Sequence, residues 1–327
     1  MLLVTGLLLS ASAYQAYYIG NSLTDCLHYG EFAEAVQAKG KEYDWGRTMI
    51  PGAPIDWLWA NGATDCLSDN EYGCYRNALT NFTWDCMTVQ PCLRGLNDDK
   101  SASGNFINLA KGKSPDVQVY VYATWPDQPW GDFSDMWLRT QANCTVECYR
   151  LDASKEYYEK LVTELRAQHP DLAKPVRLIP AGHVLYELDQ RMKRGEVAGY
   201  TSVHQFYADG CHLNGKGCYV VACAFFSTLF KQDCAGLKYD GYDGMTASLA
   251  DLIQDAAWKV VSQHPMTGVS VTASHQVLPV PAVPKPRQQT PAFTLAGKAF
   301  TTGRWSASGG KIMVGHPGRV LLYPPAR

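Results

Sequence analysis

Two segments far apart in the sequence hold the residue types that activate a serine hydroxyl. Residues 17–24 read YYIGNSLT and place Ser22 on a turn directly after a short apolar strand. Residues 207–217 read YADGCHLNGKG and place Asp209 three residues before His212. A serine hydroxyl at its ordinary pKa is a weak nucleophile, and it needs a neighbouring base that a carboxylate orients. The two segments therefore predict a Ser–His–Asp triad, provided that the fold brings them together.

The elements that would position these residues alternate between strands and helices. This alternation predicts an α/β sandwich with a mainly parallel sheet, in which residues 60–81 form a polar loop holding at most a short helix. The predicted strands span residues 17–19, 43–50, 84–89, 117–123 and 176–179, and the predicted helices span 27–39, 154–168, 217–230 and 248–261.

Four residues that could take part in catalysis or binding directly follow predicted strands. Ser22, Gly52, Gln90 and Trp125 each come just after a run of β-forming residues. Functional groups of parallel sheets collect where the carboxyl ends of the strands meet. We therefore expect these four residues along one edge of the sheet.

The two segments resemble conserved blocks of the SGNH (GDSL-like) hydrolase superfamily. The resemblance rests on GNSLT at 20–24 and on DGCHLNGKG at 209–217 before an apolar helix, and it spans roughly residues 14–265. It implies a three-layer α/β/α sandwich. It also implies that Ser22 is the nucleophile and that His212 and Asp209 complete the triad.

The resemblance further implies an oxyanion hole with three donors. The family uses the N–H of the serine, the N–H of a glycine in a second block and an asparagine side chain in a third. Gly52 in MIPGAP fits the second block, although it also fits an ordinary Pro–Gly turn. The GxND pattern of the third block is missing, and WDCMTVQP instead places Gln90 at a strand end. A glutamine amide can donate to an oxyanion as an asparagine amide does, although Gln90 could equally be a polar strand terminus.

Tryptophans suggest where substrate would lie. Trp57 and Trp59 follow Gly52, and Trp125 and Trp130 follow the fourth predicted strand. Aromatic faces at that edge would suit sugar rings or other flat, partly apolar groups. The alternative for each indole is packing in the core or in a loop.

Composition separates the body of the chain from its end. The 327 residues carry a net charge of −2, which gives no indication of nucleic-acid binding. Residues 278–291 contain five prolines, and the segment after residue 268 has Lys and Arg but no Asp or Glu. We therefore expect a hydrolase-like domain at 14–265 and a Pro-rich linker with a basic, Gly-rich tail at 266–327.

The N-terminus predicts export. Residues 1–13 read MLLVTGLLLSASA, an apolar run followed by a small-x-small pattern typical of a signal peptide, with a buried first strand as the alternative. The run is too short to span a bilayer of about 30 Å, and no other segment is long enough. We therefore expect a secreted, periplasmic or cell-surface protein.

The eleven cysteines agree with an oxidising compartment. Cys66 with Cys74, and Cys144 with Cys148, could each bridge a polar loop, whereas Cys86 and Cys223 lie in apolar patterns typical of buried thiols. Cysteine and histidine spacings typical of zinc ligands are missing, so the sequence predicts neither a metal site nor a cofactor.

With the resemblance, the sequence predicts a secreted serine esterase that hydrolyses acyl esters, in the first place acetyl esters on carbohydrate. A lipid, polyester or small-acyl esterase is the alternative within this class. A non-catalytic carbohydrate-binding or surface protein on a hydrolase fold is the alternative outside it. The expected partner is an acylated carbohydrate or another ester, and the sequence gives no indication of oligomeric state.

Overall fold

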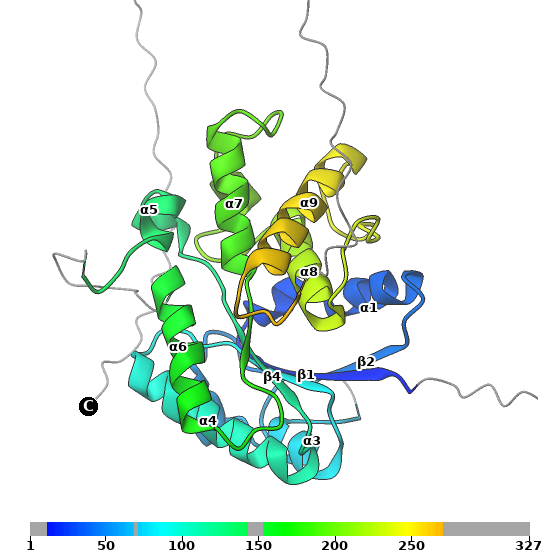
Figure 1. The fold of residues 1–327 in the computed structure, drawn as a ribbon, viewed down its shortest axis with the longest axis vertical. Coiled ribbons are helices and arrows are strands. Elements are labelled where there is room, and N and C mark those ends of the chain that lie inside the picture. Colours follow the sequence, from blue (N-terminus) through cyan, green and yellow to red (C-terminus); the bar gives the residue numbers. More distant parts are fainter. Residues whose placement is uncertain (1–11, 69–70, 143–152, 271–327) are drawn as a thin grey trace, which may run out of the picture. The chain divides into compact units, whose positions relative to one another are not determined.

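The chain divides into two compact units, Met1–Gln276 and Val277–Arg327. A computed structural model describes residues 12–68, 71–142 and 153–270, all of which belong to the first unit (Figure 1). Most of the predicted signal segment, the Cys144 and Cys148 pair and nearly all of the predicted linker and tail lie outside the described residues.

A five-stranded parallel sheet forms the centre of this unit. The strand order is β2-β1-β3-β4-β5. The strands are β1 (Tyr14–Gly20), β2 (Tyr43–Met49), β3 (Cys86–Val89), β4 (Gln118–Tyr122) and β5 (Arg177–Ile179). The register pairs Gly20 with Met49, Ile19 with Val89 and Val89 with Val121, so the carboxyl ends of the strands lie nearly level. The predicted parallel sheet is confirmed, and residues that follow its strands meet at one edge.

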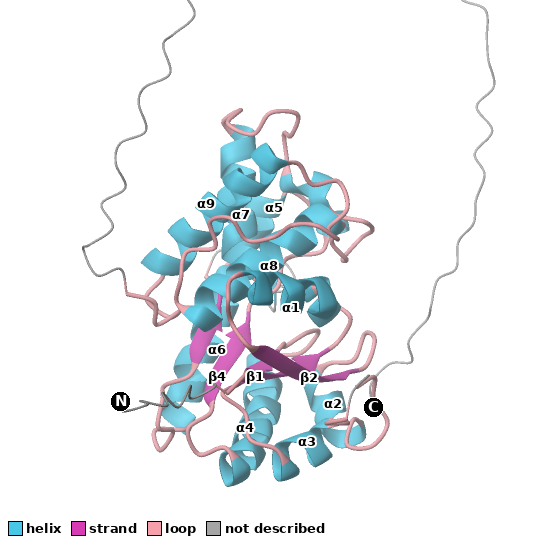
Figure 2. Ribbon diagram, turned by 90° about the vertical axis from the view of Figure 1, so that its right-hand side faces the viewer, coloured by secondary structure: helices cyan, strands magenta, loops and turns pink. Residues whose placement is uncertain are grey.

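Helices cover both faces of the sheet and complete the three-layer sandwich (Figure 2). One face carries α1 (Tyr29–Ala38), α7 (Ala181–Lys193), α8 (Gly215–Phe230) and α9 (Ala247–Gln263), and the other carries α2 (Ile55–Asn61), α3 (Tyr75–Asn81), α4 (Leu96–Lys113) and α6 (Lys155–Gln168). The short helix α5 (Phe133–Trp137) packs against α7. None of the helices in the described part of the chain has the length and apolar character needed to cross a membrane.

Helix α8 is buried on all sides and anchors the second predicted motif. Every residue from Gly217 to Leu229 is buried. Its Phe225 ring contacts those of Tyr18 in β1 and Tyr122 in β4, with centroids 5.8 and 4.9 Å apart. The helix begins three residues after His212, so the sheet fixes where that histidine enters the site.

Some elements differ from the prediction. The helix expected over 27–39 is present as α1, and His28, with a φ of 52°, separates it from the preceding 3₁₀ helix η1 (Thr24–Leu27). The region 60–81 contains the short helix α3, which the prediction allowed. Helices α4 and α7 were not predicted. The buried positions of α4 mix Phe106 and Ile107 with small residues such as Ser103 and Gly104, which weakens the apolar pattern.

The cysteine predictions can be compared with the structure in part. Cys66 and Cys74 form a disulfide across the loop before α3, as predicted. Cys86 and Cys223 are free thiols with no exposed surface, which confirms the prediction of buried thiols.

Candidate active site

Ser22 lies on a turn at the carboxyl end of β1 that the side chain of Asn21 braces. Oδ1 of Asn21 accepts a hydrogen bond from the N–H of Leu23 at 3.0 Å. Its Nδ2 donates to the carbonyl oxygen of Ala53, 3.2 Å away on the turn after β2. Asn21 is buried, whereas Ser22 is partly exposed. A buried, doubly bonded neighbour therefore fixes the backbone that presents the serine hydroxyl.

The structure brings Ser22, His212 and Asp209 into one hydrogen-bonded chain. Oγ of Ser22 lies 2.8 Å from Nε2 of His212. Nδ1 of the same imidazole lies 2.8 Å from Oδ2 of Asp209. When Nδ1–H donates to the carboxylate, Nε2 is left unprotonated and can accept the serine proton. Two segments 190 residues apart thus meet in the arrangement that nucleophilic catalysis requires.

The electrostatics of Asp209 suit the orienting role. Partial burial acts to raise the pKa of this carboxyl, but hydrogen bonds from the backbone N–H groups of His212 and Cys211 and from the imidazole outweigh it and lower the pKa to about 2. The two backbone bonds, both to Oδ1, measure 2.7 and 2.8 Å. Asp209 is therefore ionised at neutral pH, and its second oxygen remains free for the imidazole.

Cys211 lies inside the motif but is unsuited to act as a competing nucleophile. Its Sγ is 3.5 Å from Nδ1 of His212. Burial and the nearby carboxylate of Asp209 raise the pKa of the thiol to about 12. Since the thiolate is the nucleophilic form, the protonated Cys211 leaves Ser22 as the reactive group.

Trp125 supports the loop that carries the triad histidine. The indole is 1% exposed, and its Nε1–H donates to the carbonyl oxygen of Cys211 at 2.8 Å. The interpretation of Trp125 as a substrate-facing residue does not fit this burial. A second bond runs from the N–H of Gln128 to the carbonyl oxygen of Gly210, also at 2.8 Å. The segment after β4 therefore holds the 209–212 loop in place.

Gln90 is fully buried beneath the serine turn. Its Oε1 accepts a hydrogen bond from the N–H of Asn21 at 2.9 Å, and its Nε2 donates to the carbonyl oxygen of Pro91 at 3.1 Å. A Cβ at Gly20 would lie 2.6 Å from Oε1, so only glycine fits before the turn. The amide nitrogen carries two hydrogens, and the one not donated to Pro91 is available for another acceptor.

Gly52 occupies the exposed turn after β2, next to the serine turn. Its φ of 68° lies in the left-handed region that favours glycine. The two turns are joined by the bond from Asn21 to Ala53 and by a 3.4 Å bond from the N–H of Ile50 to the carbonyl oxygen of Gly20. Gly52 therefore lies within two residues of both contacts.

The remaining tryptophans divide into one partly buried and two exposed indoles. Trp59 is partly buried and packs between Tyr75 and Phe106, with ring centroids 5.3 and 5.0 Å away, so much of its ring is used in packing. Trp57 in α2 is 44% exposed, and Trp130 in the 3₁₀ helix η2 (Gln128–Trp130) is 46% exposed. The last two are the better candidates for substrate contact.

Sequence reasoning missed the side chains that brace the motifs. Asn21 accepts from the N–H of Leu23, and asparagine is known for such a side-chain bond two residues on. Oδ1 of Asn214 caps α8 by accepting from the N–H groups of Lys216 and Gly217. An asparagine just before an apolar helix is the usual signal for such a cap.

Comparison with known proteins supports the fold. No protein-family model and no curated protein matches the sequence. Among solved structures, a DUF4886 family protein from Bacteroides uniformis matches with a TM-score of 0.55 and 16% identity, over 76% of this chain and 95% of that chain. This likeness supports the α/β/α sandwich fold described above.

Two esterases are weaker structural matches. A carbohydrate esterase family 3 protein from Talaromyces cellulolyticus has a TM-score of 0.42 and 15% identity, over 67% of this chain and 97% of that chain. A catalytic mutant of an acetylxylan esterase from Geobacillus stearothermophilus has a TM-score of 0.44 and 11% identity, over 70% of this chain and 97% of that chain.

Proposed function

We propose that this protein is a secreted serine esterase that removes acyl groups, in the first place acetyl, from carbohydrate. The observation that carries the proposal is the chain from Ser22 through His212 to Asp209, with 2.8 Å in each link. The pKa of Asp209 at about 2 supports it, because an ionised carboxylate stabilises the imidazolium that forms during proton transfer.

In the acylation step, Oγ of Ser22 attacks the acyl carbon while Nε2 of His212 accepts the hydroxyl proton. The tetrahedral intermediate carries a negative oxygen. The N–H groups of Ser22 and Gly52 and the free amide hydrogen of Gln90 are the donors we assign to it. When the intermediate collapses, the imidazolium returns its proton to the departing alcohol, and the acyl group stays on Ser22.

In the deacylation step, water takes the place of the alcohol. His212 removes one proton from the water as the oxygen attacks the acyl carbon, and the same proton returns to Oγ of Ser22 when the carboxylic acid leaves. Ser22 and His212 thus regain their starting protonation states at the end of the cycle, and the reaction needs no oxidant or reductant.

The exposed indoles of Trp57 and Trp130 favour a carbohydrate as the alcohol part of the substrate. Trp57 lies on α2, which begins three residues after Gly52. Trp130 lies two residues after Gln128, whose N–H donates to Gly210. Each indole therefore belongs to a segment that borders the triad, and exposed aromatic faces suit the apolar faces of sugar rings. The predicted signal peptide supports action outside the cytoplasm.

Hydrolysis of p-nitrophenyl esters tests this proposal. We expect turnover of the acetyl ester that falls with acyl chain length and that Ser22→Ala abolishes. Acetylated oligosaccharides should be deacetylated, and Trp57→Ala with Trp130→Ala should raise KM for them more than for p-nitrophenyl acetate. A preference for long acyl chains would instead favour the lipid or polyester alternative. Equal rates for the wild-type protein and Ser22→Ala would favour the non-catalytic alternative.

A further inference from the structure

A second group of ionisable residues lies outside the triad, between three elements of the described chain. Glu159 lies on α6, His183 on α7 and His264 directly after α9. Oε1 of Glu159 lies 3.3 Å from Nε2 of His183 and 3.1 Å from Nε2 of His264. One ligand-type atom from each residue lies within 4.8 Å of the other two. None of these residues has a part in the proposed ester hydrolysis.

We propose that Glu159, His183 and His264 form a binding site for a divalent transition metal of the zinc type. In a tetrahedral zinc site the bonds to nitrogen and oxygen are about 2.0–2.1 Å, which places ligand atoms about 3.3 Å apart. The two distances from Oε1 of Glu159, 3.1 and 3.3 Å, match that spacing, and the ligand atoms of the two histidines lie within 4.8 Å of each other. Two imidazoles with one carboxylate are also a ligand set that zinc uses in proteins.

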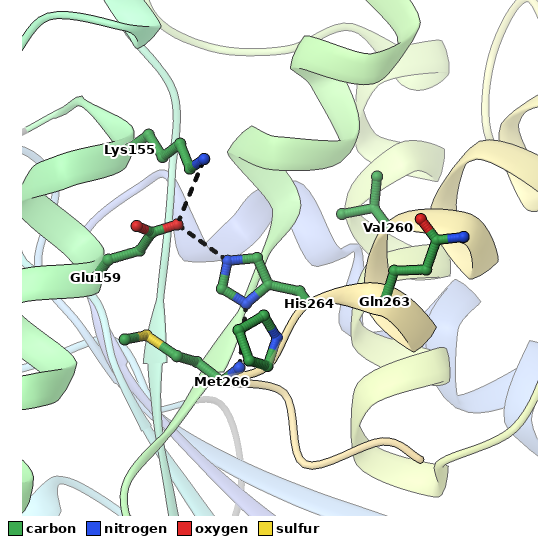
Figure 3. A pocket seen from close by; sticks show the side chains of 7 residues that line it. Lys155, Glu159, Val260, Gln263, His264 and Met266 are labelled. Atoms are coloured by element: carbon green, nitrogen blue, oxygen red, sulfur yellow. Dashed lines mark hydrogen bonds and ion pairs between the residues drawn. The ribbon is translucent and has the colours of Figure 1, made fainter. Parts of the chain in front are cut away.

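The site opens on one side to a solvent-accessible cavity. A pocket of about 410 Å³ is lined by Glu159 and His264, together with Lys155, Gln263 and Met266 among others. Glu159 and His264 point toward one another at its wall (Figure 3). The pocket gives the ion an entry path and leaves room for water as the fourth ligand.

The third ligand lies on the inner side of the site. His183 is 6% exposed, and its ring lies edge to face against His264 with centroids 4.6 Å apart. Among the described residues, its Nδ1 has no hydrogen-bond partner. A proton on Nδ1 would leave Nε2 of His183 unprotonated for a metal, in place of its present contact with Oε1 of Glu159.

Four local interactions would have to give way. Nε2 of each histidine exchanges its contact with Oε1 of Glu159 for the metal. Nδ1 of His264 accepts a 3.2 Å bond from the N–H of Met266, and this bond is lost if the proton moves to Nδ1. Nζ of Lys155 lies 3.9 Å from Oε1 of Glu159, but the lysine is 47% exposed and can turn to solvent.

This site could not be found from local sequence spacing. Its ligands are separated by 24 and 81 positions and come from three elements, so no short Cys or His motif marks it. A metal there would link α6, α7 and the segment after α9. The other group of potential ligands among the described residues, Asp209, Cys211 and His212, coincides with the triad and is not a separate site.

Metal titration of the tag-free, chelator-treated protein tests the proposal. We expect Co²⁺ to give the intense visible absorption of a tetrahedral centre, and Zn²⁺ to displace it and raise the melting temperature. Glu159→Gln and His264→Gln should each weaken metal binding by at least about 10-fold. Loss of a residue that only hydrogen-bonds to a ligand already costs about that much, and these residues are the ligands themselves. Circular dichroism checks that these variants are folded.

Two histidine variants serve as controls. His204→Gln removes a histidine outside the site, and His212→Gln removes the metal-binding capacity of the triad; both should retain the Co²⁺ spectrum. The proposal is overturned if the wild-type protein gives no tetrahedral Co²⁺ spectrum. It is equally overturned if Glu159→Gln and His264→Gln bind as the wild type does, or if His212→Gln alone abolishes binding.

Discussion

The indole N–H of Trp125 donates a hydrogen bond to the carbonyl oxygen of Cys211, which lies between Asp209 and His212 in the sequence. The bond is 2.8 Å long, and the indole is almost completely buried. Trp125 thus holds the backbone of the loop that carries Asp209 and His212. The position of His212 relative to Ser22 therefore depends on a side chain that does not itself belong to the triad.

Trp125→Phe should lower kcat by roughly 10–100-fold with little change in KM, because a small displacement of a catalytic group is costly. Loss of the hydrogen bond should also cost about 1 kcal/mol in the free energy of unfolding. Steady-state kinetics and denaturant unfolding measure both. Trp84→Phe is the matched control, since Trp84 is also buried and its Nε1–H donates to the carbonyl oxygen of Ala78 at 3.0 Å. This control should lose similar stability and keep kcat; an equal fall of kcat in both variants would contradict the positioning role.

Gln90→Ala should lower kcat by about 10²–10³-fold with a smaller effect on KM, as expected for loss of an oxyanion donor. The variant also leaves the buried N–H of Asn21 without its acceptor, at about 1–3 kcal/mol in stability. Gln118→Ala separates the two effects. Gln118 is a buried glutamine at the amino end of β4, and its Nε2 donates to the carbonyl oxygen of Pro175. It should lose stability and keep kcat, whereas unchanged kcat in Gln90→Ala would remove that residue from the oxyanion hole.

The depressed pKa of Asp209 predicts an acid-dependent contribution to stability. The folded-state pKa of about 2 lies below the ordinary value of 3.8, so the folded protein binds fewer protons here than the unfolded chain. The contribution is complete above about pH 4 and is lost as the pH falls to about 2. The difference in unfolding free energy between the wild type and Asp209→Asn should therefore shrink across that window. A difference independent of pH between 5 and 2 would show that the carboxylate is not stabilised by folding.

Residues just beyond the predicted domain end at 265 pack against the sheet. The carbonyl oxygen of Met266 accepts a 3.0 Å bond from the N–H of Leu178, and Thr267 is fully buried with its hydroxyl 2.8 Å from the carbonyl oxygen of Val261. A chain ending at Gln276 should retain the melting temperature and kcat/KM of the full protein. A chain ending at Pro265 loses these bonds, at about 1 kcal/mol each, and should melt lower. Equal melting temperatures for the two chains would contradict the packing role of residues 266–269.

The parallel sheet could be predicted because it depends on local patterns, and the triad residues could be named because their two segments resemble blocks of the SGNH hydrolases. Apolar strands in regular alternation with helices fix a parallel sheet, and Ser22 directly follows one of those strands. The direction in which a side chain points could not be predicted this way. Trp125 and Trp57 both follow strands, yet one indole faces inward under the triad loop and the other faces solvent.

Contacts between elements that are distant in the sequence could not be predicted either. The buried positions of helix α4 include Asp99, Ser103 and Gly104 beside Phe106 and Ile107, so its apolar pattern is too weak to mark a helix. The group formed by Glu159, His183 and His264 depends on how three separate elements pack. Tertiary packing, rather than local propensity, determines such contacts.

Labelling with a fluorophosphonate tests the central claim most directly, because an activated serine oxygen displaces fluoride from phosphorus and keeps the adduct. Peptide mass spectrometry of the labelled wild-type protein should find the adduct on Ser22 alone. Asp209→Asn should react slower by about 10⁴-fold, and Ser22→Ala should not react at all. An unlabelled Ser22 in folded wild-type protein, or equal labelling rates in Asp209→Asn, would contradict a triad of Ser22, His212 and Asp209.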